Sequence, residues 1–261
     1  MLRRNNLLGG ADSVKLPTGY TKLQYLDNGG NSYIDTGFKP NQDTRLVVDI
    51  ELGTQDSYPK SIFGSRNGST TSDASFIVWA ITANGFRTDF GSESLVTTVV
   101  PTGRFVIDKS KNVTTFNGIE YTHPAYTFQC DYNIGLFSQI DVDGVDTRVT
   151  AAKIYSCRIY DNGVKVRDYI PCTNFYGKSG LYDTVNKVFS PLIPTGYTLL
   201  EYLESDGKSY IDTGFKPNQN TRIVCDYYIA SKPTTSRSIY GCTNGSNYYG
   251  IFLSTSDYTN V

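Results

Sequence analysis

Apolar and polar residues alternate along most of the chain with a period of two. In residues 45–52 the apolar side chains that share one face are Leu46, Val48, Ile50 and Leu52. Such alternation is typical of a β-strand with one buried face. Further strands are predicted at 33–35, 61–64, 76–81, 86–90, 95–100, 104–108, 113–116, 119–123, 126–137, 155–159 and 164–170. No stretch of ten residues carries a convincing helical period.

Turn sequences separate these predicted strands. Asn117-Gly118 and Asn162-Gly163 each lie between two strands, and both dipeptides suit the two positive φ angles of a type I′ turn. The run Asp35-Thr36-Gly37 is interpreted as a strand-ending turn held by hydrogen bonds from side chain to backbone. Short strands joined by tight turns predict an all-β fold, an antiparallel β-sandwich or jelly roll.

A long internal repeat organises the chain. Residues 17–45 and 194–222 are identical at 22 of 29 positions, at a constant offset of 177 residues. A period of this length is the size of a whole domain, so the sequence predicts a tandem repeat. The expected parts are an arm at 1–15, a complete domain at 16–192 and the first part of a second copy at 193–261. Because a part-domain exposes strand edges, we expect the natural protein to continue beyond Val261, or another subunit to complete the second copy by strand exchange.

Charge and hydropathy exclude several classes of partner. The net charge is −1, which provides no strong electrostatic footprint for nucleic acid or an anionic membrane. No apolar run reaches the ~18 residues of a membrane span. Met1-Leu2-Arg3-Arg4 is followed by polar residues rather than an apolar signal core, so a secretory signal is not expected.

The five cysteines form no C-x-x-C pair, which argues against a zinc site or a redox motif. In the repeat, Cys225 takes the place of Val48, and this exchange indicates a small buried hydrophobic residue. Free buried thiols are therefore favoured over disulfides, in agreement with folding in a reducing cytoplasm.

Two segments carry a resemblance to a known family. Residues 23–44, LQYLDNGGNSYIDTGFKPNQDT, form the opening, and the closing runs from 153–161 through 167–172 to 180–183. Together they resemble the concanavalin A-like, laminin-G-like jelly-roll family, over residues 16–190 and in part 193–261. The resemblance implies that the first and last strands meet in one sandwich. Domains of this kind are common in phage and prophage virion proteins and in surface proteins of gut bacteria.

Candidate catalytic residues are few. His123 is the single histidine and precedes Pro124 at a strand end, so a surface or turn histidine is favoured over a catalytic triad member. Glycoside hydrolysis needs two carboxyl groups, and Asp49 and Glu51 on one strand face are the best pair. Tyr228 replaces Glu51 in the second copy, which weakens that hypothesis. We expect no enzymatic activity, with a glycoside hydrolase as the third candidate.

Two candidate binding features remain. Trp79 is the single tryptophan, and its ring either stacks on a sugar or, as favoured, anchors the core. Asp141, Asp143 and Asp146 surround Gly144, where they form either a calcium site or, as favoured, a plain Asp-Gly turn. No cofactor other than this calcium is expected.

Taken with the resemblance, these features predict a phage virion structural protein: a head fibre, decoration or tail-fibre component with lectin-like domains. The arm 1–15 would attach it to other virion proteins, through Leu2, Arg3, Arg4, Leu7 and Leu8. Symmetric fibres suggest a dimer or trimer, and the projecting domains would bind host-surface or environmental glycans. The expected location is the virion, assembled in the host cytoplasm. The alternative is a carbohydrate-binding or adhesion module on a bacterial cell surface.

Overall fold

The protein is described here by a computed structural model that covers residues 15–70, 72–83, 85–97, 103–197, 200, 202–229 and 234–253. The chain divides into two compact units, Met1–Leu199 and Leu200–Val261. The regular structure of the described residues consists of strands alone. None of their segments is a helix that could cross a membrane.

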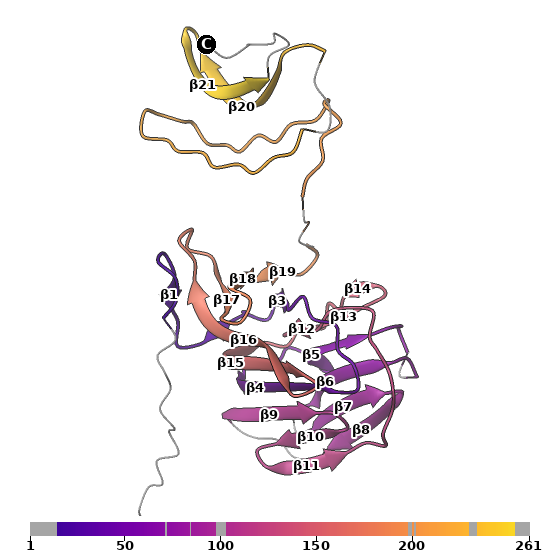
Figure 1. Ribbon diagram of the computed structural model, residues 1–261. Coiled ribbons are helices and arrows are strands. Elements are labelled where there is room, and N and C mark those ends of the chain that lie inside the picture. The colour runs from indigo at the N-terminus through magenta and orange to yellow at the C-terminus, as the bar shows by residue number, and fades with distance from the viewer. Residues whose placement is uncertain are drawn as a thin grey trace, which may run out of the picture. The chain divides into compact units, whose positions relative to one another are not determined.

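The first unit is an all-β sandwich of two large sheets, which confirms the predicted fold class (Figure 1). The order of the first sheet is β11-β10-β9-β4-β15-β16-β17-β18, with β1 beside β16 and β2 beside β15. Its strands are β1 (Thr21–Lys22), β2 (Leu26–Asp27), β4 (Thr44–Leu52), β9 (Arg104–Ser110), β10 (Val113–Phe116), β11 (Ile119–Thr122), β15 (Ala152–Asp161), β16 (Val164–Thr173), β17 (Ser179–Asp183) and β18 (Val188–Pro191). All pairings in this sheet are antiparallel.

The second sheet has the order β19-β3-β12-β5-β6-β7-β8, and β13 and β14 lie off this path. Its strands are β3 (Ser32–Asp35), β5 (Lys60–Arg66), β6 (Ser75–Thr82), β7 (Gly85–Gly91), β8 (Glu93–Thr97), β12 (Gly135–Leu136), β13 (Gln139–Asp141), β14 (Gly144–Val145) and β19 (Ile193–Pro194). Its pairings are antiparallel, apart from the parallel contact of β13 with β5.

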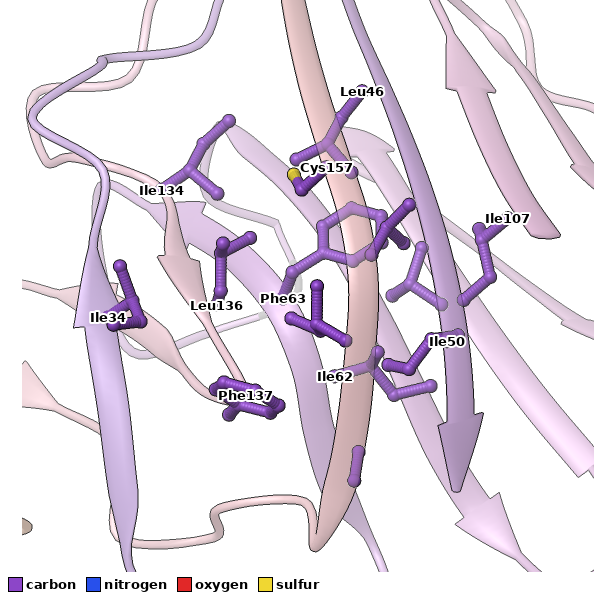
Figure 2. Close-up of a cluster of buried hydrophobic side chains, with 14 of the residues drawn as sticks. Ile34, Leu46, Ile50, Ile62, Phe63, Ile107, Ile134, Leu136, Phe137 and Cys157 are labelled. Atoms are coloured by element: carbon purple, nitrogen blue, oxygen red, sulfur yellow. The ribbon is translucent and has the colours of Figure 1, made fainter. Parts of the chain in front are cut away.

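One hydrophobic cluster fills the space between the two sheets. Leu46 and Ile50 of β4 are fully buried there, as the alternation of that strand predicted. Figure 2 shows them with Ile62 and Phe63 of β5, which come from the opposite sheet. Since burying one such aliphatic side chain contributes about 1.5–3 kcal/mol, this cluster is the main source of stability of the sandwich.

The predicted turns are present. Asn117 and Gly118 have φ angles of 47° and 88°, and Asn162 and Gly163 have 45° and 81°. These pairs join β10 to β11 and β15 to β16. The Asp35 carboxylate accepts a hydrogen bond of 2.8 Å from the Gly37 amide, which confirms the strand-ending turn.

The turn after β3 also ties the opening of the domain to its closing strands. The carbonyl of Thr36 accepts hydrogen bonds from Arg167 Nε at 3.0 Å and from the Tyr169 hydroxyl at 3.1 Å. Arg167 Nη2 donates to the Gly37 carbonyl at 3.0 Å. Because β3 lies in one sheet and β16 in the other, these bonds connect the two layers. Both segments that carry the sequence resemblance therefore meet in space.

One predicted strand is wrong over most of its length. Of residues 126–137, only Gly135 and Leu136 form a strand. The part before them is held by the loop after β3 instead: Cys130 N donates to the Pro40 carbonyl, and Ile134 N donates to the Phe38 carbonyl, both at 2.8 Å. Its alternating exposure mimics a strand, although before β12 its described residues make only the isolated bridge of Gln129 with Asn41.

The first unit extends past the boundary expected at residue 192. Ile193 lies opposite Tyr33 and Pro194 opposite Ser32, so β19 forms an edge of the second sheet. Ile193 is 4% exposed. A segment that the repeat assigns to the second copy is therefore part of the first sandwich.

In the second unit the described residues form one hairpin, β20 (Arg237–Asn244) with β21 (Asn247–Leu253). Residues 202–229 contain no strand. All five cysteines are free, and the three of the first unit are buried, as predicted. Cys225 and Cys242 are exposed, so the expectation of buried thiols is wrong for these two. Among the described residues of the second unit the only sheet is the β20–β21 hairpin, which leaves Cys225 uncovered.

Candidate functional site

A shallow depression lies beside β2 on the first unit. Its volume is about 390 Å³, and its lining is Leu23, Gln24, Tyr25, Leu26, Asp27 and Ser179. Tyr25 is half-buried. An aromatic ring with a few polar groups beside it is the usual composition of a small-ligand site. We call this feature the Tyr25 depression.

The outer face of the first sheet continues from the Tyr25 depression as a layer of rings and charges. The rings of Tyr25 and Tyr155 lie 5.6 Å apart, and the Arg104 guanidinium lies 3.8 Å from the centroid of the Tyr155 ring. Lys153 Nζ lies 5.0 Å from the centroid of the Tyr25 ring. The side chains of Arg104 and Lys153 are 51% and 35% exposed, so this surface is open to solvent.

The carboxylate pair considered for hydrolysis lies on this same face, with both groups engaged. Asp49 accepts two hydrogen bonds from Arg104, of 2.8 and 2.6 Å. Glu51 accepts one from the Tyr155 hydroxyl at 2.6 Å and lies 3.8 Å from Lys153. The bond to Glu51 is also the main cause that raises the pKa of Tyr155. Each carboxylate of the pair therefore has a hydrogen-bond partner on this face.

Trp79 does not present a ring to a ligand. It is 1% exposed, and its indole Nε1 donates to Asp89 at 3.3 Å. The guanidiniums of Arg87 and Arg148 lie 4.7 and 4.6 Å from its ring centroid. Because cations occupy positions over the ring, a sugar has no access to it. Of the two interpretations in the sequence, the anchoring role agrees with this burial.

Asp89 forms ion pairs with two arginines beside Trp79. It is 1% exposed in its side chain and accepts a 2.6 Å bond from Arg66, while Arg87 Nε lies 3.0 Å from its other oxygen. Burial lowers the pKa of Arg66, and the Asp89 charge opposes that shift. A buried pair of this kind is costly to break, since either partner alone would be an uncompensated charge.

The acidic turn does not converge on a cation position. Asp141 accepts bonds from Gln139 Nε2 at 2.8 Å and from the Asp143 amide at 3.0 Å. Asp146 is bound by the Arg148 guanidinium, at 2.6 Å for the shortest contact. Within the described ranges, no three His, Cys, Asp or Glu side chains are grouped so as to hold a metal ion. These bonds are those of a plain Asp-Gly turn between β13 and β14.

His123 is buried rather than on the surface, which corrects the sequence interpretation. It is 2% exposed, and its Nε2 lies 3.4 Å from Thr88 Oγ1. Burial, with a smaller contribution from the Lys109 charge, lowers its pKa to about 3. The groups recorded beside the ring are the Thr88 hydroxyl, the Phe90 ring and the Lys109 charge, and none of them is the carboxylate that a triad requires.

Lys109 is a buried residue that the sequence interpretation did not single out. It is 0% exposed, and its Nζ donates to Thr88 Oγ1 at 2.8 Å and to Thr114 Oγ1 at 3.2 Å. Burial lowers its pKa to about 7. The signal was present in the period of β9, because Phe105, Ile107 and Lys109 share one face.

The expected attachment residues Leu2, Arg3, Arg4, Leu7 and Leu8 lie outside the described residues. Comparison with known protein families gives no match for this chain, and comparison with curated proteins gives none either.

Proposed function

We propose that this chain is a non-enzymatic structural protein of a phage particle, attached through residues 1–15 and displaying repeated β-sandwich domains. The observation that carries the proposal is the sequence repeat of residues 17–45 at 194–222, behind a short arm. The resemblance of the opening and closing segments to domains of virion proteins adds the context. The engaged carboxylates of Asp49 and Glu51 agree with a role other than hydrolysis.

A test of location uses purified particles. Mass spectrometry of particles should detect peptides of this chain, and antibodies against it should label their surface. Deleting residues 1–15 should leave the first unit folded, since its described strands begin at Thr21, and should abolish incorporation into particles. Particles that contain no copy of the chain, or that incorporate the deletion variant normally, would contradict the proposal.

The second candidate, a glycan-binding module of a virion or a bacterial surface, is favoured by the Tyr25 depression. The repeat retains the tyrosine, as Tyr202. Binding by one shallow site would be weak, and display of many copies would provide avidity. If the chain is a virion protein, glycan binding would be a second property of its displayed domains, alongside their structural role.

The matched test changes the ring without changing the fold. Tyr25→Phe should retain glycan-array binding of a multimerised chain, because the ring remains. Tyr25→Ser should reduce binding at least tenfold, with an unchanged melting temperature within a few degrees. Equal binding by both variants would exclude the Tyr25 depression as the site.

A further inference from the structure

Two pentapeptides of the described chain, identical apart from their first residue, adopt the same turn. Residues 16–20 are Leu-Pro-Thr-Gly-Tyr, and residues 193–197 are Ile-Pro-Thr-Gly-Tyr. In both, the tyrosine amide donates to the proline carbonyl at 3.2 Å. The two glycines have φ angles of 91° and 85°, which glycine adopts readily. The local structure of the segment is therefore independent of its position in the chain.

The second occurrence is docked on the edge of a sandwich. Ile193 lies opposite Tyr33 of β3. Beyond it, Thr195 N donates to the Asn31 carbonyl at 2.9 Å, and the Tyr33 hydroxyl donates to the Tyr197 carbonyl at 3.0 Å. Figure 1 shows β19 next to β3 at this edge. The start of one repeat thus completes the sheet of the repeat before it.

The first occurrence makes a different set of contacts. The ring of Tyr20 packs on Tyr182 and Phe189, with centroids 5.1 and 5.6 Å apart. In the part of the chain that the structure describes, Leu16 and Pro17 pair with no strand. The tyrosine ring therefore belongs to its own domain, whereas the first two residues are free to pair elsewhere.

We propose that residues 16–20 are a docking strand for the β3 edge of another sandwich domain of this same repeat type. Leu16 and Pro17 would take the places that Ile193 and Pro194 hold in β19, and the tyrosine would remain with its own domain. The mode of binding is addition of an edge strand, in which backbone pairing supplies affinity and one buried side chain supplies specificity.

The chain also repeats the acceptor sequence. Ser-Tyr-Ile-Asp of β3 recurs at 209–212, where Tyr210 is 90% exposed and Ile211 is 72% exposed. In the described structure residues 209–212 form no strand, so they would act as an acceptor edge only once folded as β3 is. A molecule with both a docking strand and such an edge would form head-to-tail contacts that extend into open arrays. The inference is independent of the phage proposal, since it concerns only how repeats join.

The test empties the β3 edge in the full-length chain and supplies the docking strand as a peptide. Ile193→Asp should displace β19, because a carboxylate replaces a side chain that is 4% exposed. A peptide of residues 15–22 at millimolar concentration should then raise the melting temperature of this variant with dose, since it binds only the folded form. The unchanged chain should show no such rise, because its edge is already occupied.

Two controls keep the result decisive. The peptide with Leu16→Asp should have no effect on the variant. The chain variant Ile193→Leu makes the two pentapeptides identical and should melt within a few degrees of the unchanged chain, whereas Ile193→Ala should melt well below it. If Ile193→Asp fails to fold, the peptide should raise the melting temperature of Ile193→Ala instead. No rise in either variant, an equal rise in the unchanged chain, or a loss in Ile193→Leu as large as in Ile193→Ala would overturn the proposal.

Discussion

Replacing Lys109 by methionine should remove a pH dependence of the stability of the first unit. Lys109 is fully buried, and Thr88 and Thr114 supply its hydrogen bonds. Burial lowers its pKa from 10.5 to about 7. The folded lysine therefore releases its proton near neutrality, whereas the unfolded one retains it up to about pH 10. Methionine keeps most of the apolar stem and has no charge.

The sign and size of this pH dependence follow from the pKa values of Lys109 in the unfolded and folded states, 10.5 and about 7. Between pH 7 and 10.5 the unfolded state binds more protons, so the free energy of unfolding rises with pH. At about 1.4 kcal/mol per pKa unit, the rise between pH 7 and 8.5 is on the order of 1.5 kcal/mol. His123 does not contribute between pH 7 and 8.5. Its pKa is lowered to about 3, so its protonation changes the stability only below about pH 6.5. The buried cysteines act in the opposite direction above about pH 9, since burial raises the pKa of Cys172 to about 11.

The assay is urea unfolding of the chain and of Lys109→Met at pH 7.0, 7.75 and 8.5, followed by tryptophan fluorescence. The difference between the two chains should shift by on the order of 1.5 kcal/mol across this range, in favour of the unchanged chain at high pH. Lys111→Met is the matched control, because Lys111 is 59% exposed in the same hairpin. Equal pH slopes for the unchanged chain and Lys109→Met would refute the assignment of a buried, readily deprotonated lysine.

Three further variants test the sites described above. Trp79→Ala should cost roughly 3–5 kcal/mol in urea unfolding followed by circular dichroism, because it empties a buried position; a loss below 1 kcal/mol would contradict this. Asp89→Asn should also cost roughly 3–5 kcal/mol, since it leaves Arg66 as a buried charge without its partner, and a melting temperature equal to that of the unchanged chain would be the contrary result. Asp143→Asn should change stability by less than about 0.5 kcal/mol, and millimolar calcium should not shift the melting temperature of either chain; a calcium-dependent rise would restore the metal hypothesis.

The alternation of side chains was sufficient to predict most strands of the sandwich. In β4 the alternate residues Leu46, Val48 and Ile50 are apolar and buried, as a period of two predicts. In β15 the buried positions change parity between Ile154 and Cys157, where the register with β4 shifts, and the period alone does not predict this change. The Asn-Gly turns were equally local, because their positive φ angles depend on the two residues themselves. The same reasoning failed for 126–137, since an extended segment alternates in exposure whether or not a strand pairs with it.

The sequence by itself determined the class of fold, the turns and the existence of the repeat, all of which depend on neighbours within a few residues or on direct self-comparison. Only the tertiary structure decided which polar side chains are buried: Lys109 and His123 acquire their lowered pKa values from segments distant in sequence. It also assigned Ile193 to the sheet of the preceding repeat, because the pairing of an edge strand depends on which edge is open. Pairing and burial are properties of the assembled sandwich, and a period along the chain does not specify them.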